Sequence, residues 1–489
     1  MPKEMDERSA DSAYMLPYWN LTDTIVEGIG AMRLAGVEYL PKFPVESQKD
    51  YEFRLSCSKM TNIYRDVVEA LAAKPFEEEI SLVGENVPSQ ISEFLENVDG
   101  SGNNLSVFSS LTFFNGINSA VDWIFVDYPR TNADAIKTLA DQKAAGVRPF
   151  WSHVLGRNVL EAKSAIINGG EVLSYIRILE PVTGHVRVFE RSEIGNVTWS
   201  LWAKNEKKEW IVIDEGSLTI DVIPLVPFAT GRRDGRSFRY HPPMRDAADL
   251  QRQLYVQESA LEFAKIMAAH PMLAGNGVKP EKDAAGNPKP ITLGPARVLY
   301  APPYGDGNHG SWAFIEPSAT SLQFLASENT TTKQDLRELG RQPLTAQSGN
   351  LTVITTAVAA GKAKSAVGAW ALSLKDALEN ALKITCKWFT IQYEPEVFVY
   401  HDFDNFTDGG ADLEQLRKAR DAGDLSRETY WHELKRRRTL SSEFDAEEEC
   451  ERLLAEVPGD EYSNDSLSGD PVDPMDDPNQ MKLPLNEGE

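Results

Sequence analysis

The chain has 489 residues, 42% of them hydrophobic and 9% aromatic, which is enough for about two to four domains with buried cores. Its formal charge of −24 argues against a protein that grips nucleic acid tightly, because such affinity comes from cations that displace counterions from phosphates. No apolar run approaches the roughly 18 residues of a membrane span, and the first residues lack the apolar core of a secretion signal. We therefore expect a globular protein made in the cytosol.

Charge and cysteine placement add two expectations. Residues 441–489 contain 16 acidic and 2 basic residues, so much of the negative charge lies in this last segment. From about residue 458 it also has too few apolar residues to fold, which predicts a disordered acidic tail. Cys57, Cys386 and Cys450 are far apart and have no metal-ligand spacing, so we expect reduced thiols.

The first 130 residues read as mainly helical. We expect residues 1–12 to be frayed, and helical periodicity predicts helices at 18–36 and 47–73, the second ended by Lys74-Pro75. An apolar helix at 107–120 is followed by a strand at 121–128, and then by a polar, helical insertion at 131–146.

Between residues 148 and 228 the hydrophobic period changes from helical to two. This pattern, with turn residues every eight to twelve positions, is typical of short antiparallel strands. The expected strands are 172–178, 185–190, 197–203, 209–213 and 218–223. Together with the helices, they predict an α+β fold that is mainly helical.

Two helices bracket a segment that is rich in glycine and proline. Near-heptad apolar spacing predicts the first helix at 244–269, and a second is expected at 318–341, where Pro343 stops it. The segment between them, residues 271–315, is expected to be rich in loops, with short strands at 297–301 and 311–315.

A polar loop, Thr345–Thr352, leads into a very long amphipathic helix at about 356–392. At 1.5 Å per residue it would be roughly 55 Å long, so it needs a large partner surface. After it, the pattern predicts a strand at 396–401 and three helices, at 411–422, 426–437 and 445–457.

Motifs for catalysis and metal binding are incomplete. Ala360–Ser365 lacks the first glycine and the final hydroxyl of a phosphate loop, and His432-Glu433 lacks the second histidine of a zinc protease. Acidic groups at Asp402, Asp404 and 447–449 are more often solvated faces than cation sites. We expect no catalytic residue, no metal and no cofactor.

A basic loop carries four arginines and allows two interpretations. Its side chains suit either a phosphate or an acidic neighbour, and we prefer an ion pair between subunits. The arginines are Arg232, Arg233, Arg236 and Arg239.

The order of these elements resembles that of the tailed-bacteriophage portal protein, the head-to-tail connector. Tyr39-Leu-Pro-Lys42, with Glu46, Tyr51 and Arg54 and then Asn62 and Arg65, is similar to the N-terminal pattern of a phage portal family often described only as a domain of unknown function. Residues 422–429 resemble the crown segment of portals. One departure is residues 70–76, which lack the glycine expected before Lys74-Pro75.

The resemblance implies a fold with wing, stem, clip and crown, assembled as a ring, usually of twelve subunits. The implied regions are the wing at 1–243 with its β-rich module at about 148–230, a stem helix at 244–270, the clip at 271–316, a stem helix at 317–342, the tunnel loop at 343–355, the long wing helix and strand at 356–406, the crown at 407–457 and the acidic tail at 458–489.

The resemblance also implies a virion protein at one capsid vertex, without enzymatic activity. Double-stranded DNA would pass through its channel during packaging and ejection. The implied partners are further copies of the chain, the terminase large subunit, head-completion or tail adaptor proteins and the major capsid protein. Two alternatives stay open: another structural virion protein such as a tail adaptor or scaffold, and a nucleotide-dependent packaging enzyme.

Three groups of residues are the candidate site. Small, uncharged side chains in the tunnel loop suit contact with moving DNA: Thr345, Gln347, Ser348, Gly349, Asn350 and Thr352. The nearest cations are Lys333, Lys362 and Lys364. Cations for steering and aromatic anchors suggest docking by the clip. These clip residues are Lys279, Lys282, Lys289, Arg297, Tyr304 and Trp312.

Overall fold

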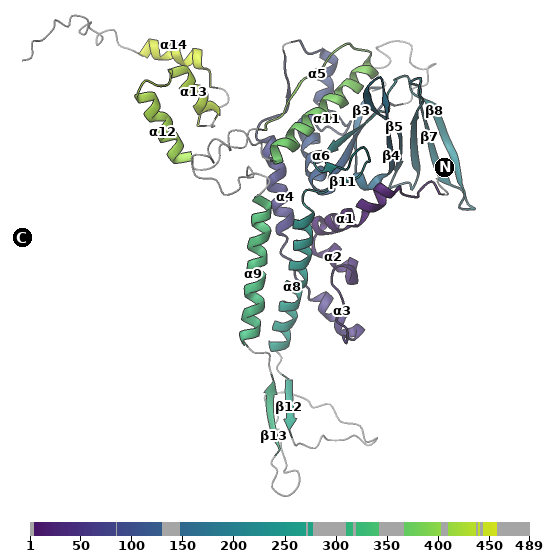
Figure 1. Ribbon diagram of the computed structural model, residues 1–489, viewed down its shortest axis with the longest axis vertical. Helices are drawn as coiled ribbons and strands as arrows, with labels where there is room; N and C mark the ends of the chain where they lie inside the picture. Colours follow the sequence, from purple (N-terminus) through teal and green to yellow (C-terminus); the bar gives the residue numbers. More distant parts are fainter. Residues whose placement is uncertain are drawn as a thin grey trace, which may run out of the picture. The chain divides into compact units, whose positions relative to one another are not determined.

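The structure is a computed structural model with mixed helix and sheet, in agreement with the predicted α+β class (Figure 1). It divides into two compact units, Met1–Asp404 and Asn405–Glu489. The described residues are 4–84, 86–129, 147–269, 272–276, 310–315, 319–341, 366–401, 409–436, 439–440 and 444–456. The insertion at 131–146, the expected strand at 297–301 and the acidic tail from 458 lie outside them.

The N-terminal segment is anchored, so the predicted fraying is wrong for residues 4–12. Helix α1 (Ala10–Glu27) begins at a Ser9 cap, and Met5 is buried. The buried guanidinium of Arg177 donates hydrogen bonds to the carbonyls of Met5 (2.6 Å) and Glu7 (2.8 Å), so a distant strand holds this segment. Gly28, with φ of 94°, then separates α1 from α2 (Ile29–Ala35).

The helix predicted at 47–73 is two helices, α3 (Gln48–Ser56) and α4 (Ile63–Ala73). Asn62 caps α4, because its side-chain oxygen accepts the Arg65 amide at 3.0 Å. Its side-chain nitrogen donates to the Ile25 carbonyl at 2.6 Å and so ties the break to α1. Two further helices follow: α5 (Ser89–Leu95) and α6 (Leu105–Ser119).

The centre of unit 1 is a three-stranded antiparallel sheet in the order β3-β2-β9. Strand β2 (Val121–Asp127) is almost wholly buried between β3 (Phe150–Val154) and β9 (Leu225–Ala229). The strand predicted at 218–223 is wrong: these residues form no strand, and the next strand is β9. Pro227 fits β9 because an edge strand need not donate every backbone hydrogen bond.

A five-stranded antiparallel meander packs against this sheet. One face joins it in an apolar cluster that contains Trp123, Ile176 and Phe189, and the other face buries Met5. The strands are β4 (Val159–Ile167), β5 (Gly170–Leu179), β6 (Val186–Arg191), β7 (Val197–Lys204) and β8 (Trp210–Ser217). Two short pairs complete the strands of this region: β1 (Ser81–Leu82) with β14 (Val397–Phe398), and β10 (Arg232–Arg233) with β11 (Tyr240–His241).

A second layer consists of helices. Helix α11 (Ala366–Phe389) packs on β2 and β9, and the hydroxyl of Ser373 donates to the Ala229 carbonyl at 2.7 Å. The long helix predicted at 356–392 is present from 366, ends at Phe389, and is undescribed before 366. It ends early because Thr390 adopts φ of 59°, which a continuing helix cannot use.

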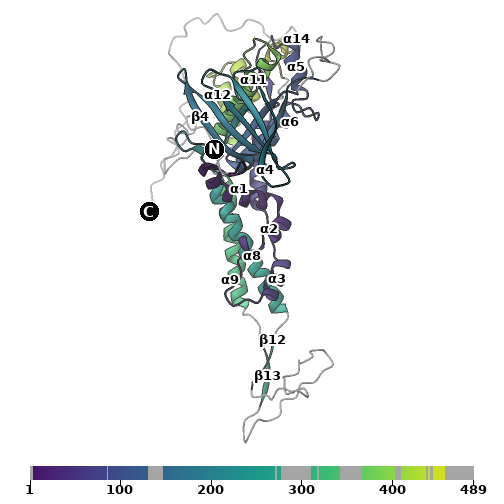
Figure 2. The ribbon, with the colours of Figure 1, turned by 90° about the vertical axis from the view of Figure 1, so that its right-hand side faces the viewer.

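Helices α8 (Arg245–Ala269) and α9 (Ala319–Arg341) lie side by side and antiparallel (Figures 1 and 2). The hairpin of β12 (Met272–Asn276) and β13 (Ser311–Ile315) continues from their ends. Helix α4 packs against both helices, and Gly340 of α9 lies close to Val67 of α4.

The described residues of unit 2 form three helices: α12 (Gly409–Asp421), α13 (Arg427–Arg436) and α14 (Ala446–Glu456). Their bounds agree with the prediction to within about two residues. The ring of Trp431 meets that of Phe444 edge to face, and Lys435 donates to the Phe444 carbonyl at 2.9 Å.

We predict that Gly340→Ala destabilises unit 1. A β-carbon at this position would lie 2.5 Å from Cγ1 of Val67, so α4 and α9 would have to separate. The expected loss is about 1 to 3 kcal/mol of unfolding free energy, measured by urea titration. The matched control is Gly30→Ala in α2, where no atom lies within 4 Å and a slight gain is expected. Equal stability of both variants would contradict the close approach.

Candidate functional site

A buried carboxylate joins three helices at the centre of the α8–α9 pair. Glu258 on α8 is 4% exposed, and one of its carboxylate oxygens lies 2.7 Å from Nζ of Lys333 on α9. Thr61, next to the start of α4, donates to the same carboxylate through its amide and its hydroxyl, both at 2.6 Å. Burial of a charge is costly unless it is paired and hydrogen-bonded, and here both conditions are met.

A second polar side chain of α8 caps α4 from outside. The side-chain oxygen of Gln251, fully buried, accepts the backbone amides of Ile63 and Tyr64, each at 3.0 Å. Its side-chain nitrogen donates to the Thr61 carbonyl at 3.0 Å. These amides belong to the first turn of α4, where no intrahelical acceptor exists. Gln251 and Glu258 therefore attach the start of α4 to α8.

Sequence reasoning missed both residues, although a signal for them was present. Gln251 and Glu258 are seven residues apart and fall within the near-heptad apolar face of this helix. A polar residue at such a position is costly unless it has a partner, so its presence indicates a specific buried contact. The partner could not be named, because Thr61 lies about 190 residues earlier in the chain.

Of the predicted channel cations, only Lys333 belongs to the described part of the chain. It is half-buried, and its charge is paired with Glu258. Lys362 and Lys364 lie outside the described residues, as do all the predicted tunnel-loop residues from Thr345 to Thr352. Among the predicted clip residues, only Trp312 is described, half-buried on β13 opposite Gly275. Lys279, Lys282, Lys289, Arg297 and Tyr304 lie outside.

Helix α9 has an exposed stripe without charge between Gln323 and Gln334, offset by roughly 90° around the helix from Lys333, and the exposed Arg337 continues the same spacing. Its members recur at helical spacing: Gln323, Ser327, Thr330 and Gln334. The hydroxyls of Ser327 and Thr330 donate to backbone carbonyls of the same helix, at 2.8 and 3.0 Å. Because these donors already have acceptors, the stripe has little capacity to hold a phosphate.

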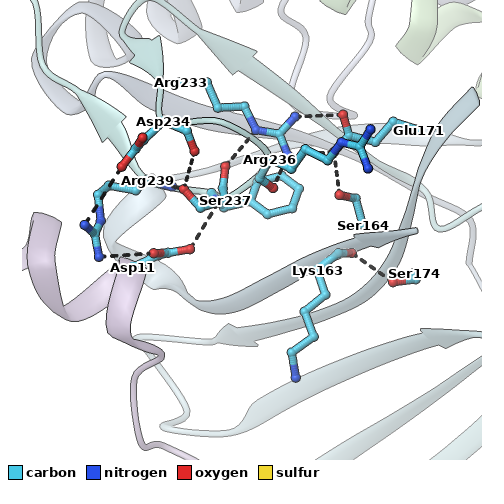
Figure 3. Close-up of polar contacts among 11 residues, drawn as sticks. Asp11, Lys163, Ser164, Glu171, Ser174, Arg233, Asp234, Arg236, Ser237 and Arg239 are labelled. Atoms are coloured by element: carbon cyan, nitrogen blue, oxygen red, sulfur yellow. Dashed lines mark hydrogen bonds and ion pairs between the residues drawn. The ribbon is translucent and has the colours of Figure 1, made fainter. Parts of the chain in front are cut away.

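The basic loop forms ion pairs within the chain, so the preferred reading of a pair between subunits is wrong for Arg233 and Arg239. Figure 3 shows both amino groups of Arg233 on the carboxylate of Glu171, at 3.0 and 2.7 Å. This hydrogen bonding holds the pKa of Glu171 below its usual value. Arg239 lies 3.5 Å from Asp11 and 4.0 Å from Asp234. Arg232 and Arg236 are exposed.

The described residues also bear on the expectations for metal ligands, thiols and membrane spans. No three acidic, histidine or cysteine side chains gather at a metal site in the part of the chain that is described. All three cysteines are free, as predicted, and burial raises the pKa of the Cys386 thiol to about 11, which keeps it protonated. Among the helices with described residues, none combines the length and apolarity needed to cross a bilayer.

Comparison with known proteins gives a family match and a set of similar folds. Residues 243–389, less than half of the chain, match a family model described as a domain of unknown function, DUF4055. No curated protein matches the chain.

Three solved structures of gene transfer agent (GTA) particles contain chains that are similar to this one, each with a TM-score of 0.38. The neck of an empty particle, computed with C6 symmetry, has a chain 11% identical, with 74% of this chain and 86% of that chain covered. The neck of a native particle, computed with C12 symmetry, gives 12% identity with 81% and 96% covered. The virion of a native particle gives 10% with 87% and 98%. Similarity at this level does not assign a function.

We predict that Lys333→Met costs about 3 kcal/mol of unfolding free energy, because it leaves the buried Glu258 carboxylate without a cation. Adding Glu258→Gln should recover part of this loss, since the one oxygen of the neutral amide can still accept the Thr61 backbone N–H and its NH2 group can donate to the Thr61 hydroxyl. Urea unfolding of the two variants measures both effects. The control is Lys265→Met, which breaks an exposed pair with Glu262 at 3.9 Å and should cost under about 0.5 kcal/mol. Equal losses at positions 333 and 265 would contradict the buried ion pair.

Proposed function

We propose that the chain is the portal protein of a tailed-phage type of particle, a ring around the DNA channel at one capsid vertex. One observation carries the proposal. The α8–α9 pair bears the β12–β13 hairpin at one end and is tied to α4 by Glu258, and helix α11 follows it in the chain. The resemblance described above equates this order with stem, clip, stem and wing helix, and the family match spans the same residues.

The charge and the surface of α9 support a channel that passes DNA without holding it. Twelve copies at −24 would carry on the order of −290, which opposes lasting binding by counterion release. The uncharged stripe from Gln323 to Gln334 is the surface of α9 that we assign to the channel. Lys333 adds no free charge there, because Glu258 compensates it.

The remaining roles follow from the same proposal. Residues 271–316 dock the terminase large subunit during packaging and a head-completion or tail adaptor protein afterwards, and residues 343–355 form the tunnel loop. The wing contacts the major capsid protein, and residues 407–457 form the crown. The ring acts on DNA sterically and conformationally, without catalysis or a cofactor, and belongs to the virion.

Electron microscopy of the purified protein tests the ring. We expect annuli with a central hole, held by interfaces of well over about 2,000 Å² per contact, as in obligate assemblies. A compact monomer at high concentration would contradict the proposal. Assemblies without a hole would favour a scaffold or adaptor, and nucleotide hydrolysis by the pure protein would favour a packaging enzyme.

Deletion of residues 347–350 tests the tunnel loop. The segment is polar and has no apolar side chain to bury, so we expect rings to form as in the parent. Packaged or retained DNA should fall several-fold, measured as the DNA content of particles made with each protein. A deletion variant that packages and retains a full genome as the parent does would exclude a role for this loop.

A further inference from the structure

Residues 34–53 expose an unusual number of large apolar side chains. An apolar patch on a soluble chain commonly marks an interface. The exposed members, which we call the arm patch, are Leu34, Val37, Phe43, Val45 and Phe53. Val45 is 98% exposed, so none of the described residues covers it. A β-carbon at Gly36 would lie 3.6 Å from the Tyr51 hydroxyl, so the backbone just after α2 lies close to α3.

We call residues 34–53 the arm. A buried ion pair holds its tip, the loop at residues 41–46, in one conformation. Arg54, almost fully buried, donates to both carboxylate oxygens of Glu46 at 2.8 Å and to the Pro41 carbonyl at 2.8 Å. Its guanidinium also lies 4.2 Å from the centre of the Phe43 ring. The hydrogen bonds from Arg54 lower the pKa of Glu46. A tip ordered in advance loses little entropy when it binds.

The arm lies beside α8, on the side away from α9 (Figures 1 and 2). Phe53 meets Phe263 of α8 edge to face, with 6.5 Å between ring centres. Phe263 follows Glu258 by five residues, about 140° around the helix, so the arm and α9 occupy different sides of α8. The α8–α9 pair thus has the arm patch on one flank and the outer face of α9 on the other.

The ion pair between Glu258 and Lys333 marks the same height along the axes of α8 and α9. Heights of other residues on the two helices can be counted from it. Phe263 is five residues, or roughly 7.5 Å, nearer the hairpin than Glu258, and in the antiparallel α9 the same step from Lys333 reaches Glu328. Phe53 therefore lies level with Glu328, and Phe324 is about one turn further. Copies related by rotation about an axis along this helix pair would bring the two flanks together at equal levels.

The outer flank of α9 carries apolar and acidic side chains that can meet the apolar side chains and the lysines of the arm. Phe324 is 62% exposed, and Glu328 and Asp335 are exposed on the same side of the helix. On the arm, Lys42 and Lys49 are exposed at either side of Val45, and Glu38, Asp50 and Glu52 are exposed as well. This flank is distinct from the uncharged stripe that we assign to the channel, because the two are offset around α9.

We infer that the arm patch of each copy packs against the Phe324 flank of α9 in the next copy, in a head-to-tail contact. The inference rests on the proposed ring and adds which two surfaces close it. Opposite charges at the rim, Lys42 and Lys49 against Glu328 and Asp335, set the orientation. A heterologous contact of this kind repeats around a closed ring.

Val45→Asp and Phe324→Asp test the two surfaces separately. Each should raise the protein concentration at which half of the chains are assembled by about tenfold or more, measured by mass photometry. Val182→Asp is the matched control, because Val182 is a valine 96% exposed on the turn between β5 and β6, and it should leave assembly unchanged. Circular dichroism should show all three variants folded, since the replaced side chains are exposed.

A mixing experiment tests the head-to-tail arrangement. The Val45→Asp protein retains an intact α9 flank and the Phe324→Asp protein an intact arm, so an equimolar mixture should form dimers that neither variant forms alone. Rings that Val45→Asp leaves unchanged, or a mixture without such dimers, would overturn this inference and leave the ring standing. A parent protein that stays monomeric would overturn both proposals.

Discussion

The buried carboxylate of Glu258 is the constraint on which the arrangement of the helices depends. Apolar faces alone would allow α8 and α9 to pack in shifted registers, but a shift of one turn moves Lys333 by about 5.4 Å and leaves a buried charge without its cation. The same carboxylate takes both donors of Thr61, so the start of α4 is fixed by the register of the pair. The position of the β12–β13 hairpin at one end of the pair follows from it.

Periodicity predicted the elements whose stability is local. The α+β class agrees with expectation. The three helices of unit 2 and the described part of α11 also agree, because each helix has a continuous amphipathic pattern. The errors lie where a distant partner decides the backbone. The break between α3 and α4 is stabilised by Gln251, and the N-terminal residues are held by Arg177, so neither is visible in local sequence. Strand β9 was displaced in the prediction because Pro227 is acceptable only at a sheet edge.

The candidate site could be predicted in outline and only partly in detail. The two helices, the loop-rich segment between them and strand β13 were expected from turn residues and spacing, but strand β12 and its pairing with β13 were not. The roles of individual charges were not readable, because a sequence does not show whether a cation has a partner. Lys333 and Arg233 appeared available for a ligand or a neighbour, yet each is paired with a carboxylate of its own chain, Glu258 and Glu171.

Thr61 is separated by a long stretch of sequence from its partners Gln251 and Glu258, and this separation affects folding during synthesis. At roughly 5 to 20 residues per second, the start of α4 leaves the ribosome about 10 to 40 s before the side chains that cap it. Arg177 likewise follows Met5 after a long interval. Until then the apolar sides of α1 and α4 have no complete partner, so the nascent chain must be shielded or remain loosely ordered. Folding of unit 1 is therefore completed late, after α8 has emerged, and not element by element.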